Sequence, residues 1–157
     1  MYKLQHISLL LIAIIIALSS CEKSETKEGV NPKITALSRK WRLTASVATY
    51  SYQAGSTDEY ATMPNCEKDD YNEIKADGTY KIYSGVSKCS PTQTDVIDAG
   101  NWSLVDNDSK IKFQTNNSTN SITLELLAVS STNYSTKLTQ TFNFGIIYTT
   151  NTYTAIP

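Results

Sequence analysis

The sequence predicts an all-β protein whose single domain folds as one antiparallel barrel of about eight strands, with a β-sandwich as the alternative. Three observations favour this class. From Trp41 onward, short segments alternate apolar and polar residues and are separated by turn-forming residues. No window shows a long apolar repeat of 3.6 residues, so we expect little helix. The length of about 137 residues after residue 20 suits one domain.

The first 20 residues have the features of a secretory signal peptide. Lys3 precedes an apolar run of about 12 residues from Ile7 to Leu18, whereas a helix that crosses a bilayer needs roughly 20. Small residues then lead to Cys21. We therefore leave residues 1–20 out of the predicted fold. An ordinary secretory signal, with no special role for Cys21, is the alternative.

The end of this segment, Leu18-Ser19-Ser20-Cys21, resembles the lipobox of bacterial lipoproteins. The resemblance implies that the Cys21 thiol receives a diacylglyceryl group and that cleavage makes Cys21 the first residue, usually with an acylated amine. Two or more acyl chains anchor a protein stably in a membrane, while one binds only marginally. Residues 21–33 would then be the lipidated cysteine and a charged, flexible tether. The barrel domain would span residues 34–157.

The elements of the domain follow in order along the chain. Residues 34–41 predict one short helical turn that leads into the first strand. In residues 41–50, alternation predicts a half-buried strand with one face formed by Trp41, Leu43, Ala45 and Val47. Residues 71–84 predict a hairpin, because Asp77-Gly78 is a strong turn signal between two β-rich segments.

The second half of the chain predicts further hairpins. Residues 100–115 form the next pair of strands around Asp106-Asn107-Asp108, a turn-forming triplet for which a calcium site is the alternative. Residues 120–130 predict a strand with Ile122, Leu124 and Leu126 on one face. Threonine and tyrosine are enriched in the remaining residues, which predict two last strands joined at Gly145.

Two cysteines remain after Cys21, and we predict that Cys66 and Cys89 form a disulfide, because export places them in an oxidising compartment. The loop of about 22 residues would stabilise the fold by on the order of 3 kcal/mol. The alternative is a thiolate zinc site, which needs three or four Cys or His ligands. The bond would pin residues 85–95 over one end of the barrel, with Asp70 accepting hydrogen bonds from the preceding turn.

The charged residues and the histidine content limit the chemistry that is available. Lys3 is one of 14 basic residues, so the chain after residue 20 has 13 basic and 15 acidic residues, which gives no electrostatic basis for nucleic-acid binding. The only histidine, His6, lies in the signal peptide. Mechanisms that need an imidazole base, and zinc sites with histidine ligands, are therefore excluded.

Paired carboxylates, as in glycosidases, are the catalytic arrangement that the composition still allows. The candidates are Asp58, Glu59, Asp69, Asp70, Glu73, Asp95 and Asp98. Because nothing in their spacing places two of them across a cleft, we expect no enzyme activity, no metal and no cofactor.

A set of large apolar residues lies on the predicted inward faces of the strands. These side chains either fill the core or line a cavity for one small ligand. The set consists of Trp41, Leu43, Tyr80, Ile82, Trp102, Ile111, Phe113 and Leu124.

The order of short motifs along residues 34–127 resembles that of the lipocalin-like lipoproteins of Bacteroidota. The motifs are Lys40-Trp41, Cys66 with Asp69-Asp70, Asp77 to Tyr80, Cys89, and Gly100-Asn101-Trp102. The resemblance implies a compact lipocalin-like barrel without catalytic residues.

Together with the lipobox, this resemblance suggests a non-enzymatic lipoprotein of the cell envelope, anchored to the outer membrane through Cys21. We expect it to bind a small apolar or glycan-like ligand in or at the barrel. The alternative is a structural or adhesion module with a filled core, whose partner is another component of the envelope.

Overall fold

The computed structural model describes residues 29–116 and 118–157. The predicted signal peptide, Cys21 and most of the predicted tether lie outside the described residues. The described chain forms three short helices and nine strands: α2 (Pro32–Leu37), β1 (Lys40–Tyr50), β2 (Ser56–Asp58), α3 (Glu59–Thr62), α4 (Asn65–Lys68), β3 (Tyr71–Ile74), β4 (Thr79–Tyr83), β5 (Val96–Val105), β6 (Lys110–Thr115), β7 (Ser121–Val129), β8 (Asn133–Phe142) and β9 (Gly145–Ile156).

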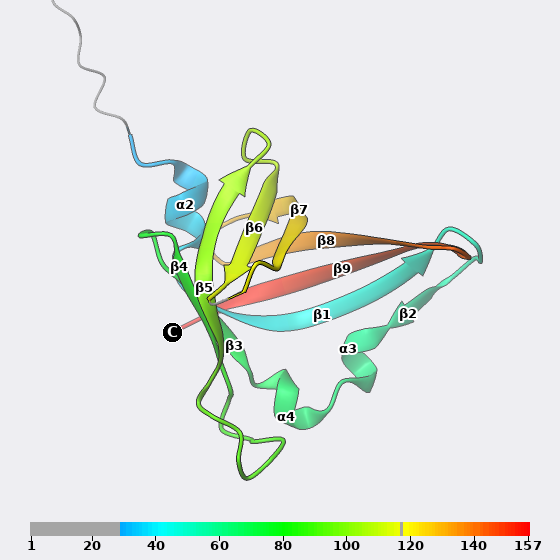
Figure 1. Ribbon diagram of the computed structural model, residues 1–157, viewed down its shortest axis with the longest axis horizontal. Coiled ribbons are helices and arrows are strands. Elements are labelled where there is room, and N and C mark those ends of the chain that lie inside the picture. Colours follow the sequence, from blue (N-terminus) through cyan, green and yellow to red (C-terminus); the bar gives the residue numbers. More distant parts are fainter. Residues whose placement is uncertain (1–28, 117) are drawn as a thin grey trace, which may run out of the picture.

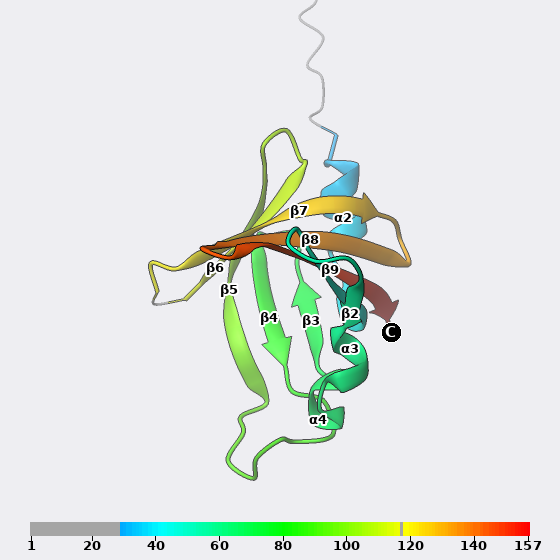
Figure 2. The same cartoon turned by 90° about the vertical axis from the view of Figure 1, so that its right-hand side faces the viewer.

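The strands form one closed antiparallel barrel (Figures 1 and 2). Each of β3 to β8 pairs with the next strand in sequence, and β9 returns to pair with β1 along its whole length. The other edge of β1 pairs with β3 in its first half and with β2 in its second half. The result is an eight-stranded lipocalin-like barrel with one extra strand. The predicted barrel is confirmed, and the sandwich alternative is wrong because closure leaves a single sheet.

The predicted turns occur where the sequence signals placed them. Gly78 has a φ of +84° in the β3–β4 hairpin, and Gly145 has a φ of +141° between β8 and β9. In the β5–β6 turn, Asp106, Asn107 and Asp108 all have positive φ between 53° and 61°. Asp and Asn tolerate this left-handed region better than most residues, which explains why the triplet makes a tight turn.

One part of the predicted pattern of β1 is wrong. A β-bulge between Leu43 and Ala45 shifts the register against β9. Because side chains alternate with a period of two, the extra residue moves the following side chains to the opposite face. Ser46 and Ala48 are therefore the buried residues of the second half of β1, instead of the predicted Ala45 and Val47.

Helix α2 closes one end of the barrel. It begins at the N-cap Asn31, whose side chain accepts from the Lys33 backbone N–H, and it buries Leu37 completely. Two contacts fix it to the β5–β6 turn: Asn31 Nδ2 donates to Asp108 Oδ2 at 2.7 Å, and Lys33 Nζ donates to the Asp108 carbonyl at 2.7 Å. The predicted helical turn is thus present, and it covers this end of the barrel.

The main core lies against this closed end. Trp41 is fully buried, donates from Nε1 to the Leu37 carbonyl at 2.7 Å, and meets the edge of Tyr134 at 4.8 Å between ring centroids. The remaining buried members of the cluster are Ile74, Tyr80, Trp102, Ile111 and Leu124. They come from five different strands, so burial of these residues fixes the closure of the barrel.

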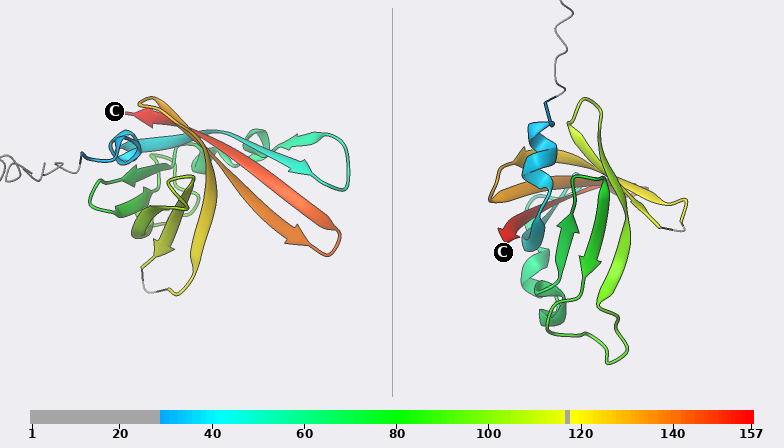
Figure 3. Two further views of the ribbon diagram at one scale, coloured as in Figure 1. Left: turned by 90° about the horizontal axis from the view of Figure 1, so that it is seen from above. Right: turned by 90° about the vertical axis from the view of Figure 1, so that its left-hand side faces the viewer.

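At the opposite end the barrel wall is incomplete. The pairing of β7 with β8 ends at Glu125 and Lys137, although β7 begins at Ser121 and β8 continues to Phe142. Beyond this point β8, β9 and β1 continue together as a long ribbon that projects away from β6 and β7 (Figures 1 and 3). The ribbon and β7 therefore diverge, which leaves an opening into the barrel.

Ionisation of the buried tyrosines is expected to destabilise the fold at alkaline pH. Burial raises the pKa of Tyr80, Tyr134 and Tyr153 above the ordinary value of 10.0. In the unfolded chain the same groups ionise near pH 10, so their contribution is complete below about pH 10 and is lost as the pH rises from there through the raised pKa of the folded state. The denaturant midpoint, measured from pH 8 to pH 11, should fall above pH 10.

The variant Tyr134→Phe serves as the comparison for this prediction, because it removes the most deeply buried of the three hydroxyls. Its loss of stability above pH 10 should be shallower than that of the wild type. A wild-type midpoint that stays constant up to pH 11 would contradict the prediction.

Candidate ligand-binding cavity

A cavity of about 310 Å³ lies inside the barrel at its open end. It is lined by side chains from β3 to β7, from β9 and from the β6–β7 loop. The apolar part of the wall consists of Tyr80, Ile82, Phe113, Ile122, Leu124 and Tyr153, and the polar part of Asn72, Asp98, Thr115, Asn120 and Ser121. The volume is at the small end of the range for ligand pockets, which are mostly apolar with a few polar groups.

The predicted inward-facing residues divide between this cavity and the core. Four of the eight line the cavity, namely Tyr80, Ile82, Phe113 and Leu124, and two of these four, Tyr80 and Leu124, also belong to the core cluster. Trp41, Trp102 and Ile111 are buried in the core cluster. Leu43 lines a second hollow beside the cavity. The sequence therefore identified the inner face of the barrel without separating the packed end from the hollow end.

The second hollow, of about 230 Å³, lies next to α4 and to Met63, the residue that follows α3. Its wall shares Asn72, Ile82 and Tyr153 with the cavity, and it also includes Glu67 and Asp70. The hollow forms where β1 lacks a strand on one edge, between its pairing with β3, which ends at Arg42, and its pairing with β2, which begins at Val47. The two hollows are thus neighbours on either side of a shared wall.

A hydrogen-bonded group of polar side chains lies in the cavity wall. The Tyr80 hydroxyl donates to Asp98 Oδ2 at 2.8 Å, and Thr115 Oγ1 lies 3.3 Å from that hydroxyl. Gly100 makes this arrangement possible, because a Cβ atom there would lie 2.9 Å from the Tyr80 ring and 2.0 Å from the Gln114 carbonyl oxygen. The absence of a side chain at Gly100 lets the Tyr80 ring pass across β5 toward Asp98.

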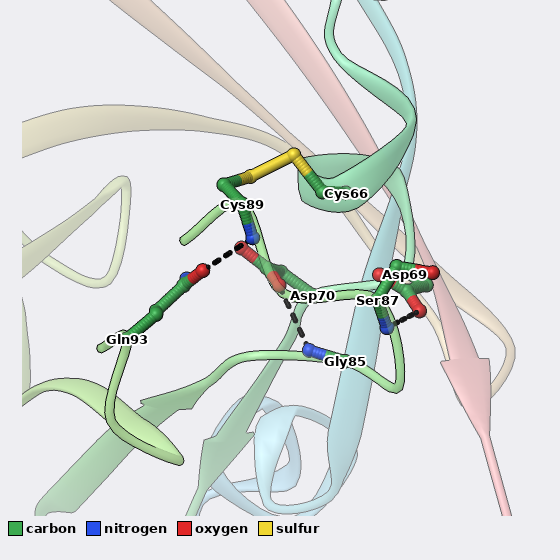
Figure 4. Close-up of a disulfide and its surroundings, with 7 residues drawn as sticks. All are labelled: Cys66, Asp69, Asp70, Gly85, Ser87, Cys89 and Gln93. Carbon is green, nitrogen blue, oxygen red and sulfur yellow. Dashed lines mark hydrogen bonds between the residues drawn. A yellow bond between two sulfur atoms is a disulfide. The ribbon is translucent and has the colours of Figure 1, made fainter. Parts of the chain in front are cut away.

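The predicted disulfide is present and joins α4 to the β4–β5 loop (Figure 4). Cys66 and Cys89 have Cα atoms 5.2 Å apart. Two neighbouring carboxylates hold the same loop: Asp70 Oδ1 accepts from the Gly85 N–H and Asp69 Oδ2 accepts from the Ser87 N–H, both at 2.9 Å. The predicted acceptor role of Asp70 was thus assigned to the wrong turn, since its partner lies 15 residues further along the chain.

The stapled loop stands at the open end of the barrel, where β4 ends and β5 begins. None of residues 85–95 lines the cavity. The disulfide therefore fixes α4 against the loop at this end of the barrel, and the loop contributes no wall to the cavity.

Replacing Asp70 separates the role of its charge from the role of its oxygen. Burial raises the pKa of the Asp70 carboxyl, and the Gly85 N–H partly opposes this effect. The ionised form is thus disfavoured in the folded state, so Asp70→Asn, which keeps the acceptor, should unfold at pH 7 with an equal or higher free energy. Asp70→Ala should lose about 1 kcal/mol. If both variants lose the same amount in a denaturant titration, the loop needs the charge instead.

The other candidate carboxylates are engaged in separate local contacts. Asp58 caps α3 by accepting from the Ala61 N–H, Glu59 accepts from the Ser46 hydroxyl, Glu73 accepts from the Tyr83 hydroxyl, and Asp95 pairs with Lys88 at 2.5 Å. Within residues 29–116 and 118–157, no group of three or more Cys, His, Asp or Glu side chains has the geometry of a metal site. No helix in this described part of the chain is long and apolar enough to cross a membrane.

Seven of the eleven cavity-lining residues lie outside the predicted inward-facing set, namely Asn72, Asp98, Thr115, Asn120, Ser121, Ile122 and Tyr153. The sequence offered Asp98 only as a candidate catalytic carboxylate. The alternation of side chains along a strand could have identified Asp98 and Asn72. Asp98 lies two residues before Gly100 and four before Trp102, and Asn72 lies two before Ile74, so both share the inward face.

Comparison with known proteins leaves the family of this chain open. No protein-family model matches the sequence, and no curated protein matches it either. The barrel, its cavity and the lipobox-like sequence at Cys21 are therefore the features that bear on the function.

Proposed function

We propose that this protein is a non-enzymatic, lipid-anchored lipoprotein of the bacterial cell envelope that binds a small organic molecule in its barrel. The observation that supports the proposal is the cavity of about 310 Å³, with apolar walls and a few convergent polar groups, inside a lipocalin-like barrel. The lipobox-like sequence at Cys21 supports attachment to the outer membrane.

Ligand binding is tested with a neutral fluorescent probe, N-phenyl-1-naphthylamine, titrated into the purified protein. Saturable enhancement of its fluorescence is expected. Ile122→Trp should weaken binding at least tenfold, because Ile122 lines the cavity while remaining 44% exposed, so a larger side chain there narrows the entrance at little cost to folding. Leu127→Trp is the matched control, since Leu127 is 46% exposed on the same strand and does not line the cavity.

Two results would contradict the binding proposal. One is the absence of saturable enhancement with the wild-type protein. The other is equal binding by Ile122→Trp and the wild type, which would place the probe outside the cavity.

The membrane anchor needs a separate experiment on the full chain expressed in a bacterial host. The wild type should fractionate with the outer membrane and should take up labelled fatty acid. Cys21→Ala should do neither, because the acyl chains are the proposed anchor. A Cys21→Ala protein that remains in the membrane fraction would show that the anchor is wrong.

A second candidate function, adhesion, is favoured by a different feature. Tyr50, Tyr52, Phe142 and Phe144, here called the aromatic tip, cluster at the far end of the projecting ribbon. Phe142 and Phe144 stack at 5.1 Å between centroids, and Tyr52 meets the edge of Phe144 at 5.4 Å. Phe142, Phe144 and Tyr52 are 40%, 57% and 45% exposed, so large apolar rings face solvent.

The surroundings of the aromatic tip favour an uncharged glycan as its partner. Residues 44–57 and 138–157 contain no Asp, Glu, Lys or Arg and are rich in hydroxyl and amide side chains. A surface of this kind offers ring faces and neutral hydrogen-bonding groups without attracting either charge. Affinity electrophoresis through gels containing neutral polysaccharides should retard the wild type but not Phe144→Ser. Val86→Ser, at a residue 97% exposed elsewhere on the surface, is the control. Equal migration of all three proteins in these gels would reject adhesion.

A further inference from the structure

The cavity wall contains a carboxylate that has no counterion among the residues that the structure describes. Asp98 lies on the inward face of β5 and lines the cavity. Four ion pairs link described residues, and Asp98 belongs to none of them. Asp98 is partly buried, and partial burial of a carboxylate without an opposite charge is unfavourable, so a cation bound at this position would be stabilised.

The hydrogen bonds of Asp98 leave room for one more donor. Its Oδ2 accepts from the Tyr80 hydroxyl at 2.8 Å and, more weakly, from the Thr115 hydroxyl at 3.4 Å. Its Oδ1 accepts from the Ala99 N–H at 2.8 Å. A carboxylate offers about four acceptor positions, so about one remains. The three contacts hold the carboxylate in a fixed orientation for that additional donor.

The charged side chains that line the cavity and the adjacent hollow are all negative. Among the residues that line the cavity and the adjacent hollow, Asp98, Glu67 and Asp70 are acidic, and none is Lys or Arg. The nearby Lys88 ammonium is engaged by Asp95 and by the Ser84 hydroxyl. Carboxylates in a low-dielectric recess concentrate a negative potential, which attracts cations and repels anions such as fatty acids.

We propose that the ligand is a small organic amine, bound with its protonated nitrogen at Asp98 and its apolar body against Phe113, Ile122 and Leu124. This inference rests on the proposed function, because it names the ligand class of the same cavity. The ammonium donates to the free acceptor position of Asp98, in a charge-assisted hydrogen bond that is stronger than one between neutral groups. The volume of about 310 Å³ limits the apolar part to a few rings or a short chain.

Three probes of nearly equal size and shape test the charge preference: 2-phenylethylamine, 2-phenylethanol and phenylacetate. Each is titrated calorimetrically at pH 7 and used to displace N-phenyl-1-naphthylamine from the wild-type protein. The amine should bind about tenfold more tightly than the alcohol, and phenylacetate should bind most weakly. This order is measured on the wild type alone, so it does not depend on the folding of a variant.

Two variants locate the preference within the molecule. Asp98→Asn keeps an oxygen that accepts from Tyr80 but removes the charge, so it should bind the amine and the alcohol within about threefold of each other. Asp95→Asn removes the same charge from a carboxylate whose side chain is 92% exposed and lies outside the cavity wall. It should keep the tenfold preference if the preference comes from the carboxylate of Asp98. Attraction by the net charge of the protein would instead be reduced equally in the two variants, because both remove one negative charge.

The contrary outcomes separate this inference from the proposed function. If the alcohol or phenylacetate displaces the probe as well as the amine does, the cavity binds ligands without selecting amines, and the inference is wrong while the proposed function stands. The same conclusion follows if Asp98→Asn keeps the preference, or if the probe binds but none of the three compounds displaces it. If the probe itself does not bind, both proposals fail.

Discussion

Replacing Trp41 with alanine is expected to lower the free energy of unfolding by about 4 kcal/mol, the largest effect that we expect from a single substitution in this protein. The Trp41 side chain is completely buried and packs between α2 and the edge of Tyr134. Its removal leaves a cavity that the closed barrel cannot fill by collapse, and it also leaves the Leu37 carbonyl without the Nε1–H donor. A denaturant titration followed by circular dichroism measures the loss.

Trp41→Phe separates packing from hydrogen bonding in the same position. It keeps an aromatic ring against Tyr134 and loses the donor to Leu37, so a smaller loss of about 2 kcal/mol is expected. Val86→Ala, at a residue 97% exposed, should have no measurable effect. A Trp41→Ala protein that loses less than about 1 kcal/mol would show that the closed end is not the main source of stability.

Removal of the disulfide is expected to have the second largest effect, a loss of about 3 kcal/mol. The bond closes a loop with a sequence separation of 23 residues, so breaking it returns conformational entropy to the unfolded chain. The double variant Cys66→Ser/Cys89→Ser is compared with the wild type in a denaturant titration. Binding of N-phenyl-1-naphthylamine should stay within about twofold, because no residue of the stapled loop lines the cavity.

Reduction of the wild-type protein provides the control for this prediction. Addition of a reductant should shift the unfolding midpoint of the wild type to that of the double variant, while the double variant should not respond. A wild-type midpoint that is insensitive to the reductant would mean that the staple does not contribute to stability in solution.

Much of the fold could be predicted because local signals and the overall topology agree. Alternating residues marked the strands of the barrel, Asp77-Gly78 and Gly145 marked two of its turns, and the parity of Trp41, Trp102 and Ile111 marked the inward faces. Each of these signals depends only on neighbours in the sequence. The pairing of Cys66 with Cys89 followed from counting the cysteines of an exported chain.

The rest depends on contacts between distant residues. The bulge after Leu43 has no marker in the sequence, because Thr44 is as compatible with a regular strand as with an extra residue. The sequence predicts no regular element for the segment from Ser56 to Lys68. This segment forms β2 and the helices α3 and α4, each of three or four residues, and such lengths are too short to show periodicity. The capping residue Asp58 before Glu59 was the available signal.

The cavity was still harder to foresee than the strands. The alternation of side chains along each strand identifies the residues that face the interior of the barrel. It does not show whether those residues pack against one another or surround a cavity. Here the difference arises where β7 and β8 separate after Glu125 and Lys137, and this separation is set by the strand register. Asp98 lies on the same face of its strand as Gly100 and Trp102, so the sequence places it facing the interior. A role in ligand binding can be inferred only once the residues around its carboxylate are known.

The most direct test of the central claim, that this barrel binds a small organic molecule, is native mass spectrometry of the protein purified from the envelope of its own cells. Wild type, Ile122→Trp and the control Leu127→Trp are compared. A bound small molecule should add the same mass to the wild type and to Leu127→Trp, and this mass should be absent from Ile122→Trp. If all three proteins show only the mass of the acylated polypeptide, or if all three retain the molecule equally, the claim that the cavity is the binding site is contradicted.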